Sequence, residues 1–230
     1  MNNFNNVGIT VLLISISATT FIARAADPYQ AFIDKPDADT AFAYMHQVAI
    51  HPRCTNCHGV VDKNGSFYPT VGEQRRPHPM NITVDNNVVL FKDGETFKQI
   101  DAVALSCTSC HQQSNGKMAG MPPGNKSSAM LGFVWHMPQQ NMTIPAGITE
   151  KQLCNQWLDP THNSSHLAQR GGRDDLVTFK KEFHDHHVSL DPLVAWSWSP
   201  GPGREKAPGQ RQDFIRAVGV WIEAGAPCPE

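Results

Sequence analysis

The sequence carries little charge, and it has no long run of basic or acidic residues. Charged residues make up 17% of the 230 residues, whereas about 25% is typical of soluble proteins. The formal net charge is only −2, and no basic run is longer than the pairs Arg75-Arg76 and Lys180-Lys181. These properties argue against nucleic acid or an anionic membrane as the partner of this protein.

Long hydrophobic runs are also missing. The most apolar stretch begins with Val11-Leu12-Leu13-Ile14, and it is too short and too rich in Ser and Thr for a membrane span of about 20 apolar residues. Ala23-Arg24-Ala25 offers small residues at the positions of a cleavage site. We therefore interpret residues 1–25 as a signal peptide, which predicts a periplasmic protein without a membrane span after cleavage. An uncleaved anchor is the alternative, because no Lys or Arg precedes Arg24.

Apolar residues recur mostly at helical spacing, between loops that are rich in the 17 Gly and 17 Pro residues. We expect a mainly α, loop-rich fold with about five helices and little or no sheet. The expected helices span residues 38–49, 97–104, 150–158, 176–187 and 214–222. Asp37 and Thr149 are suited to cap helix starts, and Gly225 is suited to end the last helix. Short strands are expected around residues 82–84 and 88–91.

Four of the six cysteines lie in two copies of one motif. Cys54-Thr55-Asn56-Cys57-His58 and Cys107-Thr108-Ser109-Cys110-His111 both read C-x-x-C-H, which is the attachment signature of c-type haem. On one helical turn, residues i and i+3 share a face and residue i+4 lies beside them. Two thiols can then add to the haem vinyl groups while the imidazole reaches the iron from the same side. The sequence therefore predicts two covalently bound haem c groups, with His58 and His111 as proximal ligands.

A zinc site and a redox dithiol are the alternatives for these cysteines. A zinc site with four cysteines is expected to have about 15–20 residues between its two pairs, whereas 49 residues separate Cys57 from Cys107. Zinc also gives no reason for a His to follow both pairs. A redox dithiol is expected beside a βαβ pattern, and the sequence has none. Haem is the interpretation that uses all six motif residues.

Cys154 and Cys228 remain. In an oxidising compartment we expect them to form a disulfide that holds the carboxy-terminal tail on the body of the protein. Such a bond would close a loop of about 75 residues, which in the chain-entropy model contributes about 4 kcal/mol. Two unrelated thiols are the alternative.

The sixth ligand of each iron decides its chemistry, because a second His, a Met or an open position give different reactivity. The first candidate is His78, which two prolines hold in a stiff loop, Pro77-His78-Pro79-Met80. The second is His136, in Trp135-His136-Met137-Pro138, which follows an apolar stretch. Either residue could instead be an ordinary surface or core histidine.

Three further candidates follow in order of preference. His187 shares a predicted helix face with Leu176 and Phe183, and it points inward. His51 precedes the first motif by three residues, so it could reach only the other haem. Met121, in Met121-Pro122-Pro123, resembles the Met-Pro loop of single-haem class I cytochromes c, but it lies only 10 residues after His111.

Both haem motifs follow an expected helix, and no linker separates them. We therefore expect a single dihaem domain over residues 26–230. Its haem-attachment part spans about residues 26–147, and a helical carboxy-terminal part spans about residues 148–230. Covalent haem would supply much of the apolar interior, which allows a loop-rich chain to be compact.

Short runs across most of the mature chain resemble a family of small exported dihaem proteins that is often labelled as an isoquinoline 1-oxidoreductase subunit. The runs are His51-Pro52-Arg53 with the first motif, Arg76-Pro77-His78, Trp135-His136-Met137-Pro138, Asp191-Pro192-Leu193-Val194-Ala195-Trp196, Pro200-Gly201-Pro202-Gly203-Arg204 and Ala224-Gly225-Ala226-Pro227-Cys228-Pro229. The resemblance implies an electron-transfer partner of a periplasmic molybdenum hydroxylase-type dehydrogenase. It also singles out His51, His78, His136 and His187.

Three functions are compatible with two haems. The first is a dihaem cytochrome c that passes electrons singly from a dehydrogenase to the respiratory chain. The second is a haem enzyme of the peroxidase type, and the third is a haem sensor that binds a small ligand. Both alternatives need an iron with an open position.

Overall fold

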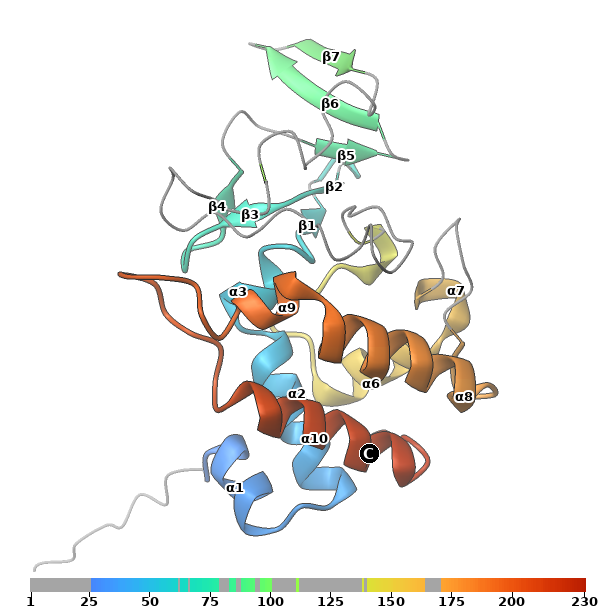
Figure 1. The fold of residues 1–230 in the computed structure, drawn as a ribbon. Coiled ribbons are helices and arrows are strands. Elements are labelled where there is room, and N and C mark those ends of the chain that lie inside the picture. The colour runs from blue at the N-terminus through green and yellow to red at the C-terminus, as the bar shows by residue number, and fades with distance from the viewer. Residues whose placement is uncertain are drawn as a thin grey trace, which may run out of the picture.

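The computed structural model describes residues 26–61, 63–65, 67–78, 83–85, 88–93, 96–100, 111, 138, 140–163 and 171–230, so the proposed signal peptide lies outside it. Helices dominate the described part of the chain (Figure 1). They are α1 (Pro28–Asp34), α2 (Ala38–Ala49), α3 (Pro52–Thr55), η2 (Gln140–Met142), α6 (Glu150–Leu158), α7 (Pro160–Asn163), α8 (Leu176–Phe179), η3 (Lys180–Val188), α9 (Pro192–Trp196) and α10 (Arg211–Glu223). The prediction of a mainly α fold with little sheet is confirmed.

Helix α2 begins where its sequence predicts. The Asp37 side chain accepts the N–H of Thr40 at 3.0 Å, and the Thr40 hydroxyl accepts the N–H of Asp37 at 3.2 Å, which together form a capping box. Hydrogen bonds from Lys35 and Thr40 lower the pKa of the Asp37 carboxyl to about 2. The cap therefore stays ionised at any pH above that value. Helix α6 starts in the same way, with Thr149 and Gln152 as the capping pair.

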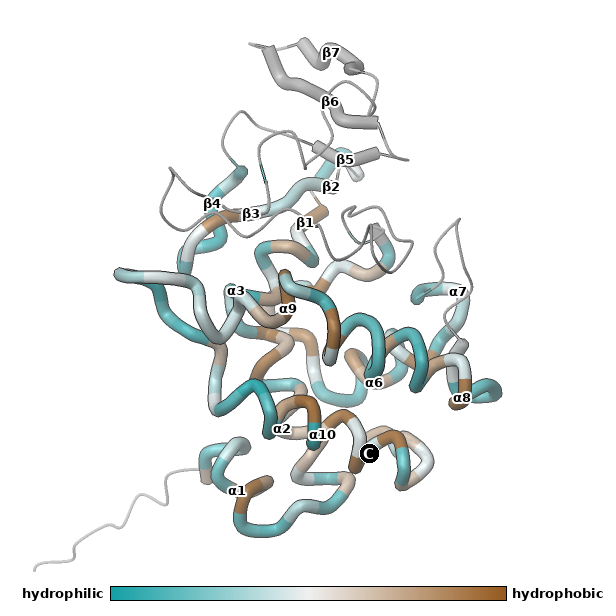
Figure 2. The backbone as a smooth tube through the Cα atoms, in the orientation of Figure 1, coloured by the Kyte–Doolittle hydropathy of each residue, from teal (hydrophilic) through white to brown (hydrophobic). Residues whose placement is uncertain are grey.

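One hydrophobic cluster joins helices from both ends of the chain. The ring of Phe42 on α2 lies 5.9 Å from that of Trp157 on α6 and 5.1 Å from that of Trp221 on α10, measured between centroids. Trp221 is fully buried. Hydrophobic segments alternate with hydrophilic ones along α10 (Figure 2), as expected for a helix with one face in the core. Residues before the first haem motif and residues near the carboxy terminus therefore share one core.

The strands in the described part of the chain form three small antiparallel sheets. They are β1 (Val60–Val61) with β2 (Phe67–Tyr68), β3 (Thr70–Val71) with β4 (Arg76–Pro77), and β5 (Thr83–Asp85), β6 (Val88–Asp93) and β7 (Thr96–Ile100) in that order. Strands β5 and β6 lie where the sequence predicts short strands. The β3–β4 hairpin matters for the site, because His78 directly follows it.

The expected helix over residues 97–104 is wrong in its first part. Residues 96–100 form β7, which pairs with β6 and places Phe97 opposite Lys92 and Ile100 opposite Val89. Thr, Phe and Ile favour strands, and the ladder to β6 outweighs the helical spacing of the apolar residues. Residues 101–104 lie outside the described part of the chain.

The expected helix over residues 176–187 changes its winding after one turn. Helix α8 continues directly into η3, which is a π-helix and carries His184, His186 and His187. The backbone N–H of Ser189 donates to the carbonyl of His184, five residues earlier. Segments of π-helix are rare and occur frequently at functional sites. The wider winding changes the direction in which side chains leave this helix, relative to an α-helix of the same sequence.

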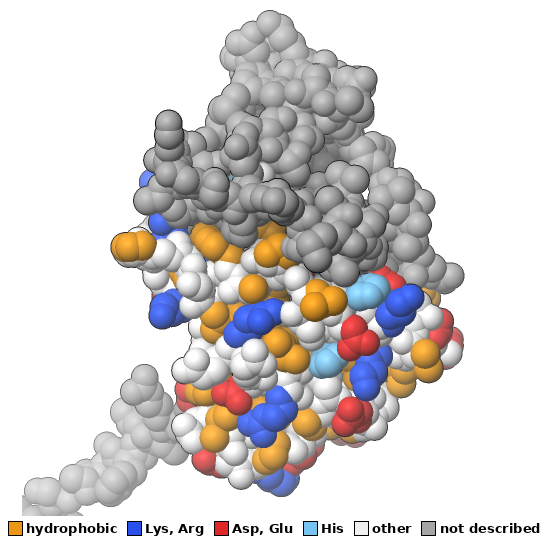
Figure 3. Space-filling model, viewed as in Figure 1, with side chains coloured by type: hydrophobic (Ala, Val, Ile, Leu, Met, Phe, Trp, Pro, Cys, Tyr) orange, Lys and Arg blue, Asp and Glu red, His pale blue; other side chains and the backbone are white. Residues whose placement is uncertain are grey.

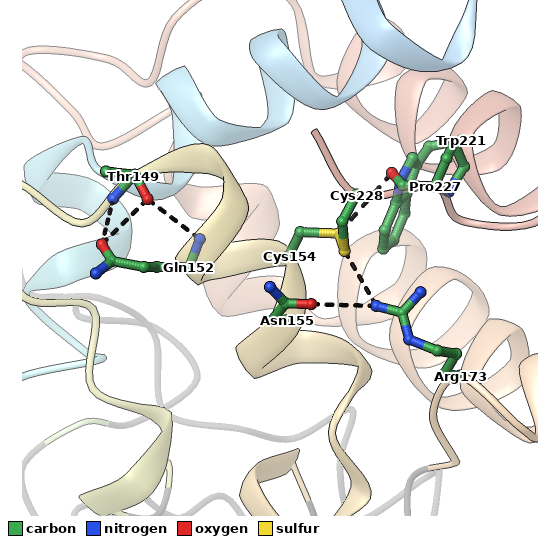
Figure 4. Close-up of a disulfide and its surroundings, with 8 residues drawn as sticks. All are labelled: Thr149, Gln152, Cys154, Asn155, Arg173, Trp221, Pro227 and Cys228. Atoms are coloured by element: carbon green, nitrogen blue, oxygen red, sulfur yellow. Dashed lines mark hydrogen bonds between the residues drawn. A yellow bond between two sulfur atoms is a disulfide. The ribbon is translucent and has the colours of Figure 1, made fainter. Parts of the chain in front are cut away.

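The predicted disulfide between Cys154 and Cys228 is present. It links α6 to the carboxy-terminal tail (Figure 4). Arg173 lies against the bond, with Nη2 3.2 Å from Cys228 Sγ and 3.2 Å from Asn155 Oδ1. The indole of Trp221 donates to the carbonyl of Pro227 at 2.8 Å. The tail is thus fixed to α6 and to α10 at once.

Two properties of the described residues concern possible partners. Among the described helices, none combines the length and the apolar character that crossing a membrane requires. On the face shown in Figure 3, acidic and basic side chains are interspersed over the described helices. The described part of that face therefore presents a mixed charge pattern, which agrees with the near-neutral net charge.

Candidate haem-attachment site

The first C-x-x-C-H motif lies on a helical turn. Helix α3 contains Cys54, and the chain continues the turn through His58, whose N–H donates to the carbonyl of Cys54 at 3.0 Å. The N–H of Cys57 donates to the same carbonyl at 3.2 Å. His51 caps the helix, because its Nδ1 accepts the N–H of Arg53 at 3.2 Å. The two thiols and the imidazole therefore leave one turn, which is what double attachment to a haem requires.

Gly59 ends this turn and lets the chain enter β1. Its φ is +54°, and a Cβ at this position would lie 2.4 Å from Cε2 of Phe67 and 2.6 Å from the carbonyl oxygen of Tyr68. The position thus combines a left-handed conformation with a close approach to β2. Only glycine satisfies both conditions.

We expect Gly59→Ala to lower the free energy of unfolding by about 2 kcal/mol or more, from backbone strain and the clash together. It should also reduce the share of chains that carry the first haem. Gly65→Ala is the matched control, because Gly65 has φ +81° but open space around its Cβ position. Thermal unfolding and the haem-to-protein ratio measure both effects. If Gly59→Ala and Gly65→Ala lose equal amounts of stability and haem, the close approach of Gly59 to β2 is not the cause.

The imidazole of His58 is held through one of its ring nitrogens. Its Nδ1 lies 2.8 Å from the carbonyl oxygen of Met142, at the end of η2. A carbonyl oxygen only accepts, so Nδ1 carries the proton and Nε2 keeps the lone pair that a metal ligand needs. Such a bond to the second ring nitrogen is the usual support of a metal-binding histidine.

The ring of His187 on η3 lies close to the ring of His58. The two ring centroids lie 6.3 Å apart, and the ring planes are at 77°. Nδ1 of His187 lies 3.5 Å from Oδ2 of Asp191, the residue that caps α9. Burial raises the pKa of the Asp191 carboxyl. The interaction with His187 and hydrogen bonds from two backbone N–H groups lower this pKa by a larger amount, so it lies below its usual range. The ionised carboxylate therefore favours the proton on Nδ1 of His187, which again leaves Nε2 for a metal.

The histidine of the second motif also lies close to a histidine from another part of the chain. His111 is 9% exposed, and its ring centroid lies 6.1 Å from that of His78. The ring planes are at 57°. His78 is held by the hairpin before it, since its N–H donates to the carbonyl of Pro69 at 3.2 Å. Cys107 and Cys110, the attachment cysteines of this motif, lie outside the described residues.

The spacing within each histidine pair fits two imidazoles that would bind one metal between them, as a haem iron would require. Imidazole nitrogen binds a metal at about 2.0–2.1 Å, so the ring centroids of two opposed ligands should lie about 6 Å apart. The observed spacings are 6.3 Å and 6.1 Å. Two aromatic rings in ordinary contact also lie about 4.5–7 Å apart. The spacing therefore indicates paired ligands only because one histidine of each pair belongs to a C-x-x-C-H motif. Each described motif histidine faces a histidine from a distant part of the chain.

The other candidate ligands have different surroundings. The Nδ1 of His51 caps α3, and its Nε2 lies 3.7 Å from Glu205, so the structure places His51 in neither histidine pair. His136 and Met121 lie outside the described residues. Met142 and Asp191, which contact the candidate ligands His58 and His187, were not predicted from the sequence. The sequence does indicate one role of Asp191, because an Asp directly before Pro192 is typical of the start of a helix.

The Cys54 thiol lacks the character of a redox dithiol. Burial, with a smaller contribution from the neighbouring Cys57, raises its pKa to about 12. Redox-active C-x-x-C thiols instead have a lowered pKa, which makes them nucleophilic near neutral pH. The surroundings of Cys54 thus favour an attachment residue over a redox centre.

The chain matches no protein-family model, no curated protein and no solved structure. The functional assignment therefore stands on the two motifs and on the geometry of the described residues.

Proposed function

We propose that this protein is an exported dihaem cytochrome c that transfers electrons. One haem is attached to Cys54 and Cys57 and has His58 and His187 as axial ligands. The other is attached to Cys107 and Cys110 and has His111 and His78 as axial ligands. The observation that carries the proposal is the second histidine opposite each motif histidine, at 6.3 Å and 6.1 Å.

When bound, haem c supplies a one-electron change between its ferric and ferrous states. The residues of the chain set the conditions for that change. With His58 and His187 on one iron and His111 and His78 on the other, no ligand position would remain for peroxide or a gas. The Met142 carbonyl and the Asp191 carboxylate lie at Nδ1 of His58 and of His187, so they would limit the rotation of both rings. This arrangement favours electron transfer over a peroxidase or a ligand sensor.

The location and the partners belong to the proposal as well. A disulfide such as Cys154–Cys228 is typical of an oxidising compartment, and residues 1–25 have the pattern of a signal peptide. Both features support the periplasm. By its resemblance to the dihaem family, the protein would accept electrons from a molybdenum hydroxylase-type dehydrogenase and deliver them to the respiratory chain.

Optical spectroscopy tests the proposal on the full chain exported by a bacterium that attaches haem c. We expect low-spin spectra for both haems in the oxidised and reduced states, and no change when carbon monoxide is added to the reduced protein. A high-spin ferric signal that binds added ligand in the wild-type protein would instead favour an enzyme or a sensor.

The contact between Asp191 and His187 gives a prediction about the potential of one haem. A carboxylate bound to Nδ1 makes an imidazole a stronger donor, which stabilises ferric iron. We therefore expect Asp191→Asn to shift one of the two midpoint potentials to a more positive value. Asp185→Asn is the matched control, since Asp185 pairs with His184 at 2.6 Å on the same π-helix. A spectroelectrochemical titration measures both potentials, and a shift of equal size in the control would contradict the assignment.

A further inference from the structure

The ligand His78 depends on a very short hairpin. Strands β3 and β4 are joined by two residue pairs, Thr70 with Pro77 and Val71 with Arg76. His78 follows Pro77, and its N–H bond to Pro69 extends the hairpin by one step. An isolated two-stranded hairpin is marginally stable at best in water. The position of His78 therefore requires support from another part of the protein.

That support comes from the first haem motif, through Asn56. The N–H of Thr70 donates to the Asn56 carbonyl at 3.0 Å, and the Thr70 hydroxyl donates to Asn56 Oδ1 at 2.9 Å. Asn56 Nδ2 donates to the carbonyl of Gly72 at 3.1 Å. Thr70 is only 4% exposed. Because water cannot easily replace a bond at such a position, each bond is expensive to lose.

Arg75 joins the hairpin to the same turn from its other end. Its Nη2 donates to the carbonyl of Gly59 at 3.1 Å and to that of Ile144 at 3.3 Å. Gly59 directly follows His58, and Ile144 lies two residues after Met142, which holds the His58 ring. The hairpin is thus tied to the attachment turn of the first haem at two points, Asn56 within the motif and Gly59 directly after it.

We infer that the Asn56–Thr70 contact couples the two haem sites, with Thr70 as a positioning residue for His78 at the second iron. This inference rests on the proposed function. The turn that attaches the first haem would then also fix the position of His78, the ligand of the second haem. Loss of the contact should loosen His78 and leave the pair of His58 and His187 intact, since no described bond of His187 passes through the hairpin.

The test compares Thr70→Val with Thr70→Ser in the full exported chain. Valine has the shape of threonine without its hydroxyl, whereas serine keeps the hydroxyl. We expect Thr70→Val to raise the fraction of reduced haem that binds carbon monoxide roughly tenfold, the effect of one lost buried hydrogen bond. Thr70→Ser should resemble the wild type, and intact mass should show both haems attached in each variant.

Double variants identify which haem responds. Thr70→Val should add no carbon monoxide binding to His78→Ala, in which the second iron is already open, but it should add binding to His187→Ala. If Thr70→Val fails to accumulate, Asn56→Leu tests the same contact, because it removes Oδ1, the acceptor of the Thr70 hydroxyl.

Failure of this inference and failure of the proposed function would give different results. Low-spin haems in the wild type with no response in Thr70→Val, or with a response confined to the His187 haem, would overturn the inference alone. A wild-type protein without two low-spin haems would overturn the proposed function and the inference together.

Discussion

Replacing His187 by alanine is expected to turn one of the two haems high-spin while both remain attached. His187 faces His58 at 6.3 Å between ring centroids, and alanine has no group that reaches the iron from η3. The opened position should bind carbon monoxide in the reduced protein, at one equivalent per chain. Magnetic circular dichroism and a carbon monoxide titration measure the change.

His184→Ala is the control for this result. His184 lies on the same π-helix, and its Nδ1 is paired with Asp185, so its loss should leave both haems low-spin. His78→Ala should open the other haem, and the variant that lacks both His78 and His187 should bind two equivalents. If His187→Ala keeps two low-spin haems, the axial assignment at the first site is wrong.

Loss of the disulfide should give the largest effect on stability. The bond joins residues 74 positions apart, and a loop of that size contributes about 4 kcal/mol in the chain-entropy model. For a protein of this length, Cys154→Ala with Cys228→Ala should lower the melting temperature by roughly 8–16 °C. Thermal unfolding followed by circular dichroism measures the shift.

Reduction of the disulfide provides the control. A thiol reductant should lower the melting temperature of the wild type by a similar amount and leave the double variant unchanged, because thioether links to haem resist reductants. A double variant that melts within a few degrees of the wild type would show that the tail is held mainly by packing, for example through the bond from Trp221 to Pro227.

The longer helices were predictable because their signals are local. Asp37 and Thr149 act as caps, and the apolar residues of α2, α6 and α10 repeat at helical spacing toward the core. Residues 96–100 show the limit of such reasoning. Their spacing also suits a helix, and only the ladder to β6, a tertiary contact, selects the strand.

The shared turn of the first motif was predictable from the sequence, and the histidine that lies beside His58 was less so. The motif spacing alone indicates how Cys54, Cys57 and His58 share a turn. The partner of His58 lies in η3, more than a hundred residues away in the chain. No local pattern specifies that contact, and the change from α to π winding that directs His187 is equally invisible in the sequence. The support of His78 by Asn56 and Thr70 is also a contact between segments.

Intact mass spectrometry of the exported protein under denaturing conditions tests the central claim most directly. Covalent haem survives denaturation, so the account predicts a chain heavier by two haems, with peptide fragments that locate one at Cys54 and Cys57 and the other at Cys107 and Cys110. A bare chain, or a chain with a single haem, from a bacterium that attaches haem c to a control cytochrome would contradict it.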